Sequence, residues 1–145
     1  MSAGPSTERF DLSIRIRPDD IDVLEHVNNV VYLRWVQEAA TAHWNAAATT
    51  RQRASIGWVV VRHEIDYLHP ALPGDEILAR TWVGLVLRND FERHTEILRR
   101  RDMQVLARAR SLWCPIDLAS RKPTRVGEDV RARFSVSTNG PGTAD

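Results

Sequence analysis

Residues 20–32 read Asp-Ile-Asp-Val-Leu-Glu-His-Val-Asn-Asn-Val-Val-Tyr, and this stretch decides how the rest of the chain is interpreted. After it, from Asn29 to about Ala48, apolar residues recur at helical spacing over a wide stripe. A stripe of that width predicts a helix that is buried on most of its circumference. Asn28 or Asn29 can cap this helix through a side-chain oxygen.

Strand patterns lie on both sides of the helical segment. Residues 10–17 alternate apolar and polar side chains, which is typical of a half-buried strand. From about Ile56 the period changes from helical to alternating, and short polar breaks divide the second half of the chain into strands. The expected strands run from Ile56 to Leu68, Glu76 to about Leu87, Phe91 to about Arg100 and Gln104 to about Asp117, with a short helix over 127–134. The order β-α-β-β-β-β predicts an α+β domain whose mostly antiparallel sheet wraps around one apolar helix.

Length and composition exclude several classes of protein. A chain of 145 residues, 43% hydrophobic and without internal repeats or linkers, suits one globular domain. Its net charge of +1 argues against non-specific nucleic-acid binding, and no segment resembles a membrane helix or a signal peptide. The single Cys114 excludes an internal disulfide and a multi-cysteine zinc site. We expect a cytoplasmic domain over residues 8–134, flexible termini at 1–7 and 135–145, and no metal or cofactor.

The residues around the predicted helix start carry groups suited to acyl-transfer chemistry. A helix N-terminus offers unpaired N–H groups and a partial positive charge. These donors can hold a carbonyl oxygen while negative charge builds on it. A neighbouring carboxylate can attack the carbonyl or activate a water, and Asp22 is the candidate. An acid before a helix also often serves only as a cap, so a structural role is the alternative for Asp22 and the expected one for Asp20.

Three other residues with reactive side chains are expected to be structural. His43 lies within the helical pattern and His63 within a strand pattern, so both are expected to be core or interface histidines with satisfied ring nitrogens. Cys114 lies in an apolar strand between Trp113 and Pro115, which predicts an inert core thiol.

The string Asp-x-x-x-His-Val-Asn-Asn-x-x-Tyr, from Asp22 to Tyr32, resembles the signature of hotdog-fold thioesterases of the 4-hydroxybenzoyl-CoA thioesterase type. It is most similar to the His-Val-Asn-Asn branch, which includes bacterial long-chain acyl-CoA thioesterases. Residues 64–70 and 73–75 resemble the second-strand segment and the following turn of the same family. The resemblance covers residues 8–134. It implies a single hotdog domain that hydrolyses an acyl thioester, either an acyl-CoA or an acyl carrier protein thioester, without a cofactor.

The resemblance also implies site residues. Asp22 matches the catalytic aspartate of the family, and Asn29 matches the helix start whose backbone N–H polarises the thioester carbonyl. His26 matches a histidine that plant acyl-carrier-protein thioesterases are considered to use in catalysis, although Leu24 stands where the plant pattern has asparagine. A loop-holding role is therefore the alternative for His26. Asn28 and Tyr32, from the same string, are expected to contact the substrate.

Assembly and two alternative functions follow from the same resemblance. The family pairs two protomers into a continuous sheet with the active site at their interface, which implies a homodimer or a homotetramer. Independently of the resemblance, alternation gives the sheet one charged face, on which opposite charges of adjacent strands can pair. This face is expected to face solvent, with a second-subunit surface as the alternative, and it carries Arg62, Glu64, Asp66, Arg80, Glu92, Glu96, Arg108 and Arg110. A hotdog-fold acyl-thioester dehydratase and a non-catalytic acyl-thioester binding protein are the alternative functions. The acid before the Asn-Asn pair favours the hydrolase over both.

Overall fold

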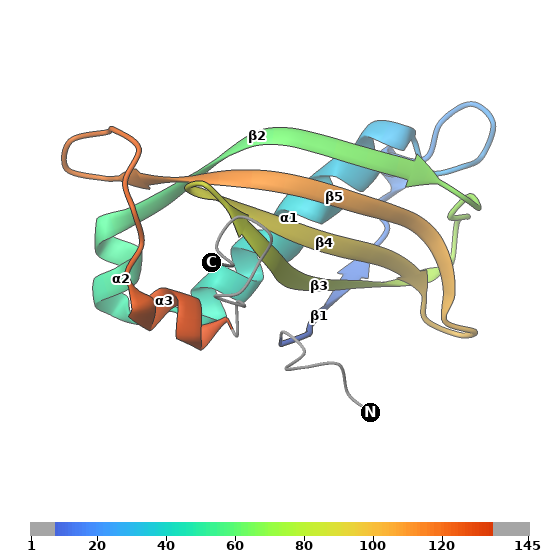
Figure 1. Ribbon diagram of the computed structural model, residues 1–145. Helices are drawn as coiled ribbons and strands as arrows, with labels where there is room; N and C mark the ends of the chain where they lie inside the picture. Colours follow the sequence, from blue (N-terminus) through green and yellow to red (C-terminus); the bar gives the residue numbers. More distant parts are fainter. Residues whose placement is uncertain (1–7, 135–145) are drawn as a thin grey trace.

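The computed structural model describes residues 8–134 and shows a five-stranded antiparallel sheet curved around one long helix (Figure 1). The elements are β1 (Phe10–Arg15), a 3-10 turn (Pro18–Asp20), α1 (Asn29–Ala47), α2 (Thr50–Ser55), β2 (Ile56–Tyr67), β3 (Glu76–Leu87), β4 (Asp90–Arg99), β5 (Gln104–Asp117) and α3 (Glu128–Arg133). This is the predicted α+β architecture of a single hotdog domain. The segments 1–7 and 135–145, predicted to be flexible, lie outside the described residues.

The strand order in the sheet is β1-β3-β4-β5-β2, and every neighbouring pair is antiparallel. A meander of all four strands after the helix was expected, but only the last three form one, because β2 pairs with β5 rather than with β3 and becomes an edge strand. In Figure 1 β2 forms the upper edge of the sheet, next to β5. Its outer side has no strand partner among the described residues, so β2 leaves backbone donors and acceptors available along that edge.

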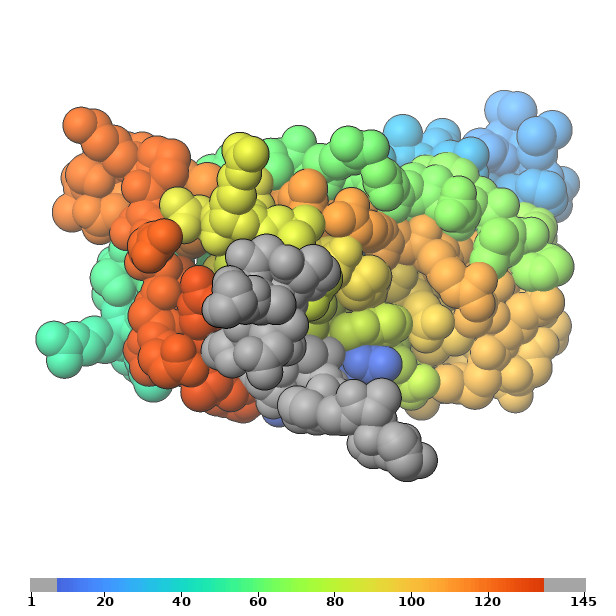
Figure 2. Space-filling model, viewed as in Figure 1, coloured from blue at the N-terminus to red at the C-terminus, as the bar shows by residue number. Residues whose placement is uncertain are grey.

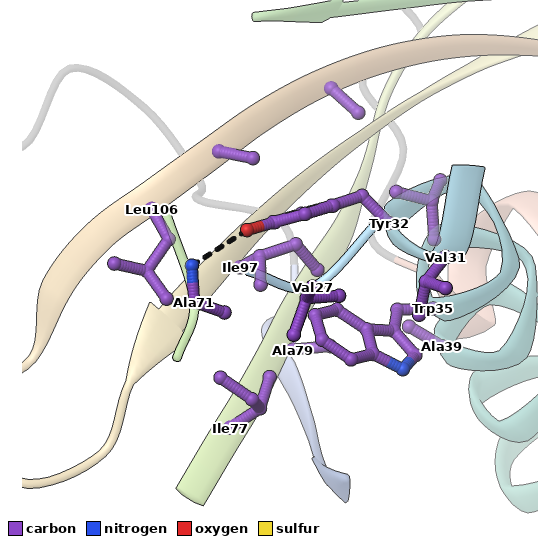
Figure 3. Packing of buried hydrophobic residues seen from close by; sticks show 13 residues of the cluster. Val27, Val31, Tyr32, Trp35, Ala39, Ala71, Ile77, Ala79, Ile97 and Leu106 are labelled. Carbon is purple, nitrogen blue, oxygen red and sulfur yellow. Dashed lines mark hydrogen bonds between the residues drawn. The ribbon is translucent and has the colours of Figure 1, made fainter. Parts of the chain in front are cut away.

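The core lies between α1 and one face of the sheet (Figure 3). Trp35 and Val36 of the helix are fully buried, and Ile77 and Ile97 of the sheet are almost fully buried against the same cluster. Alanines occupy many of the remaining inward positions, namely Ala39, Ala79, Ala107 and Ala109. These small side chains let the helix approach the sheet closely around the large Trp35 ring. Burying each large apolar side chain stabilises the fold by about 1.5–3 kcal/mol.

The buried stripe of α1 is narrower than predicted. Its buried residues are Val31, Tyr32, Trp35, Val36, Ala39, Ala40 and His43. On the opposite side Gln37, Thr41 and Asn45 are exposed. The expectation that the helix is buried on most of its circumference is therefore wrong for a single chain, because the sheet covers only one side of it.

Two local features also differ from the prediction. β1 ends at Arg15 rather than Arg17, because the chain turns at Pro18 and the Asp20 carboxylate accepts a hydrogen bond from the Arg17 N–H at 2.8 Å. The short helix α2 was not predicted. It begins at a reciprocal capping box in which the Gln52 N–H donates to Thr49 Oγ1 at 3.1 Å and the Thr49 N–H donates to Gln52 Oε1 at 2.8 Å.

The two ends of α1 lie in different surroundings. The loop before α1 lies at one end of the molecule, while α2 and α3 close the other end (Figure 2). A second apolar cluster lies under α3 and contains Val83, Phe91, Val130 and Phe134. No helix within residues 8–134 combines the length and the apolar character needed to cross a membrane.

The charged face of the sheet carries cross-strand ion pairs, as predicted. Arg108 of β5 pairs with Glu96 of β4 at 3.7 Å, and Arg80 of β3 pairs with Asp11 of β1 at 2.8 Å. These side chains are partly exposed, so each pair adds at most about 1 kcal/mol.

Candidate active site

Asp22 organises the loop that leads into α1. Its Oδ1 accepts hydrogen bonds from the N–H groups of Leu24 at 2.9 Å and His26 at 3.3 Å. Its own N–H donates to the His26 carbonyl at 2.8 Å, and its carbonyl accepts from the Glu25 N–H at 2.9 Å. The loop is therefore a closed turn built on one carboxylate oxygen. The other oxygen, Oδ2, has no hydrogen-bond partner within residues 8–134.

The turn depends on an unusual backbone conformation at Glu25. Its φ of 61° lies in the left-handed region, which favours glycine. A residue with a Cβ atom loses roughly 1 kcal/mol there. The four backbone and side-chain hydrogen bonds of Asp22 hold Glu25 in this conformation.

The start of α1 presents a free backbone donor. Asn28 is the N-cap, as predicted, and its Oδ1 accepts from the Val30 N–H at 3.0 Å. The Asn28 N–H is used as well, since it donates to the Asp20 carbonyl at 2.8 Å. The Asn29 N–H has no acceptor in the described part of the chain. It lies at the positive end of a 19-residue helix, where it can receive a carbonyl oxygen.

Asp20 has the structural role predicted for it. The residue is 2% exposed, and both of its carboxylate oxygens lie 3.0 Å from Nη2 of Arg34 on α1. Oδ2 also accepts from the Arg17 N–H. These bonds fix the loop to the first turns of α1. Arg34 was not anticipated, because nothing in a single sequence indicates which cation meets a given acid.

An open groove brings the predicted site residues together. One side is formed by Asp22, His26, Asn28, Asn29 and Tyr32, and the other side by residues 67–70. The contribution of Tyr67, whose hydroxyl donates to the Asn29 carbonyl at 3.1 Å, was not predicted. The resemblance of residues 64–70 to the second-strand segment of the family was the sequence feature that could have indicated this contribution. It gave no distance between Tyr67 and a residue 38 positions earlier in the chain.

Tyr32 forms the buried floor of this groove. The residue is 2% exposed, and its hydroxyl accepts a hydrogen bond from the Ala71 N–H at 2.8 Å (Figure 3). Its ring lies edge-on to the Tyr67 ring, with 5.3 Å between the centroids. Burial raises the pKa of the Tyr32 hydroxyl, so the group stays protonated at neutral pH. Its contact with a substrate would be made by the ring.

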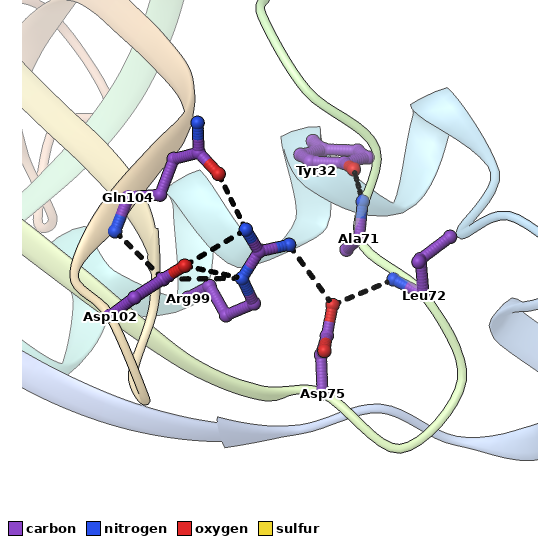
Figure 4. Close-up of polar contacts among 7 residues, drawn as sticks. All are labelled: Tyr32, Ala71, Leu72, Asp75, Arg99, Asp102 and Gln104. Atoms are coloured by element: carbon purple, nitrogen blue, oxygen red, sulfur yellow. Dashed lines mark hydrogen bonds and ion pairs between the residues drawn. The ribbon is translucent and has the colours of Figure 1, made fainter.

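The segment opposite the loop is fixed by a second set of polar contacts (Figure 4). Oδ2 of Asp75 accepts from the Leu72 N–H at 3.0 Å and lies 3.9 Å from Nη1 of Arg99. Arg99 is held in turn by Asp102 at 3.1 Å. Together with the Tyr32–Ala71 bond, these contacts hold both sides of the groove in place.

The histidines differ in how their ring nitrogens are used. The His26 ring is half-buried at the groove and makes no hydrogen bond to the described residues. Both ring nitrogens of buried His43 are bonded, to Glu8 and to Arg93, as predicted. For His63 the prediction holds only for Nδ1, which lies 2.7 Å from Ser111 Oγ, because Nε2 is buried without a partner among the described residues. Burial lowers the pKa of His63.

Cys114 is not the core thiol that was predicted. The side chain is only partly buried. Burial, with a smaller contribution from Asp90, still raises the pKa of this thiol, which keeps it protonated and weakly reactive at neutral pH. Within residues 8–134 no three His, Cys, Asp or Glu side chains are grouped as a metal site requires.

A sequence profile of the thioesterase-like superfamily matches residues 16–134 of the chain. A sequence search of curated proteins gives no match. Several solved structures share the fold. A 1,4-dihydroxy-2-naphthoyl-CoA thioesterase from Synechocystis is 21% identical, with a TM-score of 0.76 over 88% of this chain and 96% of that one.

Two further solved structures are similar over most of their length. A probable thioesterase from Escherichia coli is 26% identical, with a TM-score of 0.72 over 85% of this chain and 94% of that one. A thioesterase from Thermus thermophilus, complexed with coenzyme A and Zn, is 24% identical, with a TM-score of 0.73 over 86% and 90%.

Proposed function

The chain belongs to the thioesterase-like superfamily and is an enzyme that hydrolyses acyl thioesters, and on this premise we propose that its substrate is an acyl-CoA and that Asp22 supplies the reacting carboxylate. One observation carries the proposal. Oδ1 of Asp22 accepts hydrogen bonds from the loop backbone, whereas Oδ2 has no partner among the described residues. Asp22 lies in the same groove as Asn29, whose backbone N–H is free at the start of α1. A carboxylate held through one oxygen keeps a fixed orientation while the other oxygen remains available for chemistry.

The reaction follows from these two groups. The Asn29 N–H donates to the thioester carbonyl oxygen and stabilises the negative charge that develops on it. Oδ2 of Asp22 takes a proton from a water molecule, whose oxygen attacks the carbonyl carbon. Collapse of the tetrahedral intermediate breaks the carbon–sulfur bond, and the departing thiolate receives the proton. Direct attack by Oδ2, followed by hydrolysis of the resulting anhydride, uses the same oxygen and is the alternative route.

His26, Asn28 and Tyr32 complete the proposed site. The unpartnered His26 ring lies in the groove, where it can hold a water or the substrate. Asn28 fixes the helix start through its Oδ1 and keeps its amide group exposed. The Tyr32 ring supports the acyl group from below. Coenzyme A as the thiol carrier is supported by two of the structural relatives, one described as acting on a naphthoyl-CoA and one complexed with coenzyme A.

We also propose that two copies pair through β2. The strand is an edge of the sheet, and it exposes two apolar side chains, Val59 at 52% and Val61 at 55%. Apolar residues on an open edge strand favour pairing with another strand. The same strand carries Tyr67 into the groove, which would bring the site close to the partner.

Replacing Asp22 with Asn tests the proposal. The substitution keeps the size and the Oδ1 acceptor but removes the charge, so the loop should stay folded. We expect kcat for acyl-CoA hydrolysis to fall by about 10²–10⁴-fold while KM changes less. Asp19 is exposed in the preceding turn, and Asp19→Asn is the matched control that should keep full activity. A folded Asp22→Asn protein with near-normal turnover would show that the carboxylate lies elsewhere.

A further inference from the structure

A second cavity lies at the other end of α1, between the second half of that helix and the sheet. Its volume is about 190 Å³, and its wall includes Trp44, Trp58, Phe91, Trp113 and Phe134. Trp44 lies fifteen residues after Asn29, which corresponds to roughly 22 Å along the helix axis. The cavity is therefore separate from the groove around Asp22 within one chain.

The aromatic wall is packed as a continuous series of rings. Phe134 stacks on Trp44 at 5.8 Å between centroids, Trp44 meets Trp58 edge-on at 5.4 Å, and Trp58 meets Phe91 edge-on at 5.0 Å. Rings that hold one another in this way leave little freedom for the wall to collapse into the space. The cavity is thus preformed and suited to an apolar ring or a short chain.

One charged side chain lines this apolar cavity. Arg93 is 7% exposed, and its Nη1 donates to His43 Nδ1 at 3.0 Å and to Thr81 Oγ1 at 3.1 Å. Within residues 8–134 no carboxylate lies within salt-bridge distance of the guanidinium. A buried cation is normally paired, because an unpaired charge is costly to remove from water.

The neighbouring groups do not neutralise Arg93. Burial and then the charge of Arg93 lower the pKa of His43 to about 4, so the ring is neutral at pH 7. Its Nε2 then donates to Glu8 at 3.0 Å. Glu8 is also paired with Arg133 at 3.0 Å. Glu8 therefore compensates the charge of Arg133, and Arg93 keeps an uncompensated positive charge in this cluster. Burial lowers the pKa of Arg93 only to about 10, so it stays protonated.

Trp58 and Trp113 both line the cavity. Their indole Nε1 atoms are covered by other protein atoms and have no hydrogen-bond partner among the described residues, so these N–H groups are not open to an occupant. The charged group in the cavity wall is the Arg93 guanidinium, which can only donate, so an occupant that pairs with it must bring acceptor oxygens.

We propose that this cavity binds a small apolar organic acid, with the ring or chain between the aromatic side chains and the carboxylate accepting from Arg93. An engineered apolar cavity of about 150 Å³ holds benzene, so 190 Å³ accommodates a molecule of the size of benzoate or hexanoate. The acid is a free carboxylic acid, because a short acyl group held at the Asn29 N–H cannot span the roughly 22 Å along α1 to this cavity. The proposal therefore does not rest on the proposed function.

Binding of benzoate and of benzamide, measured by titration calorimetry, tests the site without any need for hydrolysis. We expect the wild-type protein to bind benzoate and to bind uncharged benzamide much more weakly. Arg93→Met should weaken benzoate binding at least about tenfold, as loss of a charged hydrogen bond implies. Arg100→Met is the matched control, because Arg100 lies exposed in the turn after β4 and its side chain bonds only to Ser13 within residues 8–134.

A second variant covers the case in which Arg93→Met does not fold. Thr41 lines the cavity and is exposed, so Thr41→Trp should fold, and its larger ring should occupy part of the cavity and weaken benzoate binding severalfold. Absence of benzoate binding to the wild type, equal binding of benzoate and benzamide, or equal benzoate affinity in the wild type and in a folded Arg93→Met protein would each overturn the proposal.

Hydrolysis is measured separately, because the cavity lies apart from the groove around Asp22. Failure of the proposed hydrolysis would appear as no turnover of hexanoyl-CoA by the wild-type protein while benzoate still binds.

Discussion

At the scale of single residues, Asp20 and Asp22 have different roles because their carboxylates make different contacts. Asp20 is buried and uses both oxygens on Arg34, so it holds the loop. Asp22 is half-buried and uses one oxygen only. The resemblance singled out Asp22, and a loop-holding role was expected for Asp20, but the free Oδ2 could not be predicted, because it depends on how the turn closes around Glu25.

His26 can be tested for the two roles that the sequence left open. Its backbone N–H and carbonyl bond to Asp22, while its ring bonds to none of the described residues. His26→Ala should therefore change the free energy of unfolding by less than about 0.5 kcal/mol. We expect kcat to fall by about 10²-fold. Thermal melts and steady-state rates measure the two effects, and a melting temperature that falls in parallel with kcat would assign the ring to loop stability.

His43 predicts how stability depends on pH. Its folded-state pKa of about 4 lies below the ordinary value of 6.5, so protonation favours the unfolded chain. Its contribution is complete above pH 6.5 and is lost as the pH falls towards 4, by roughly 3 kcal/mol over that window. The lowered pKa of Glu8, caused mainly by its bond to His43, acts in the same direction at lower pH.

Chemical denaturation between pH 7.5 and 4.5 measures this dependence. His43→Gln removes the titrating ring, so the slope of stability against pH should flatten. His69→Gln is the control, because His69 is exposed and makes no hydrogen bond through its ring to the described residues. An unchanged slope in His43→Gln would mean that the acid sensitivity comes from other groups.

At the scale of the elements, periodicity predicted most of the structure. β3 and β5 begin and end where the pattern places them, and α1 begins at Asn29. The alternation of side chains along β4 also shows which of its charged residues points into the domain. Glu92 and Glu96 belong to the outer face of β4, so Arg93 must point inward, although an arginine there looks like a surface residue. The width of the buried stripe on α1 was misjudged, because alanines occur on both covered and open sides.

The capping box of α2 is visible in the sequence as Thr49-x-x-Gln52, although no helix was predicted there. Thr49→Ala removes the acceptor for the Gln52 N–H and should cost about 1 kcal/mol of stability. Thr49→Ser keeps the hydroxyl and should cost much less. Urea denaturation compares the two, and equal losses would mean that α2 depends on its packing rather than on its cap.

At the scale of the whole molecule, the fold was predicted but the meeting of distant segments was not. Tyr67 reaches Asn29, and Arg93 lines a cavity with Trp44 and Trp113, because the sheet curves around α1. Curvature arises from strand twist and side-chain packing along the whole sheet. A single sequence contains no direct measure of this curvature, so neither the groove nor the cavity could be predicted from it.

The proposed dimer makes a prediction at the same scale. Light scattering should give twice the 16.5 kDa mass of the chain, or four times that mass if dimers pair. Val59→Lys places a charge on the open edge of β2 and should shift the protein towards monomer and lower its activity. Met103→Lys alters a similarly exposed apolar residue at the β4–β5 turn and should leave the mass unchanged. A stable, fully active monomer would contradict a site at a shared interface.

The pairing of Glu8 with Arg133 has a consequence for the connectivity of the chain. These residues lie near the two ends of the described segment, and their side chains meet at 3.0 Å beside the end of α1. The order of the helices and strands along the chain could therefore be changed while their positions in the fold stay the same. A circular permutant that joins residues 134 and 8 by a short flexible linker and opens the exposed turn at 101–102 should fold to the same domain.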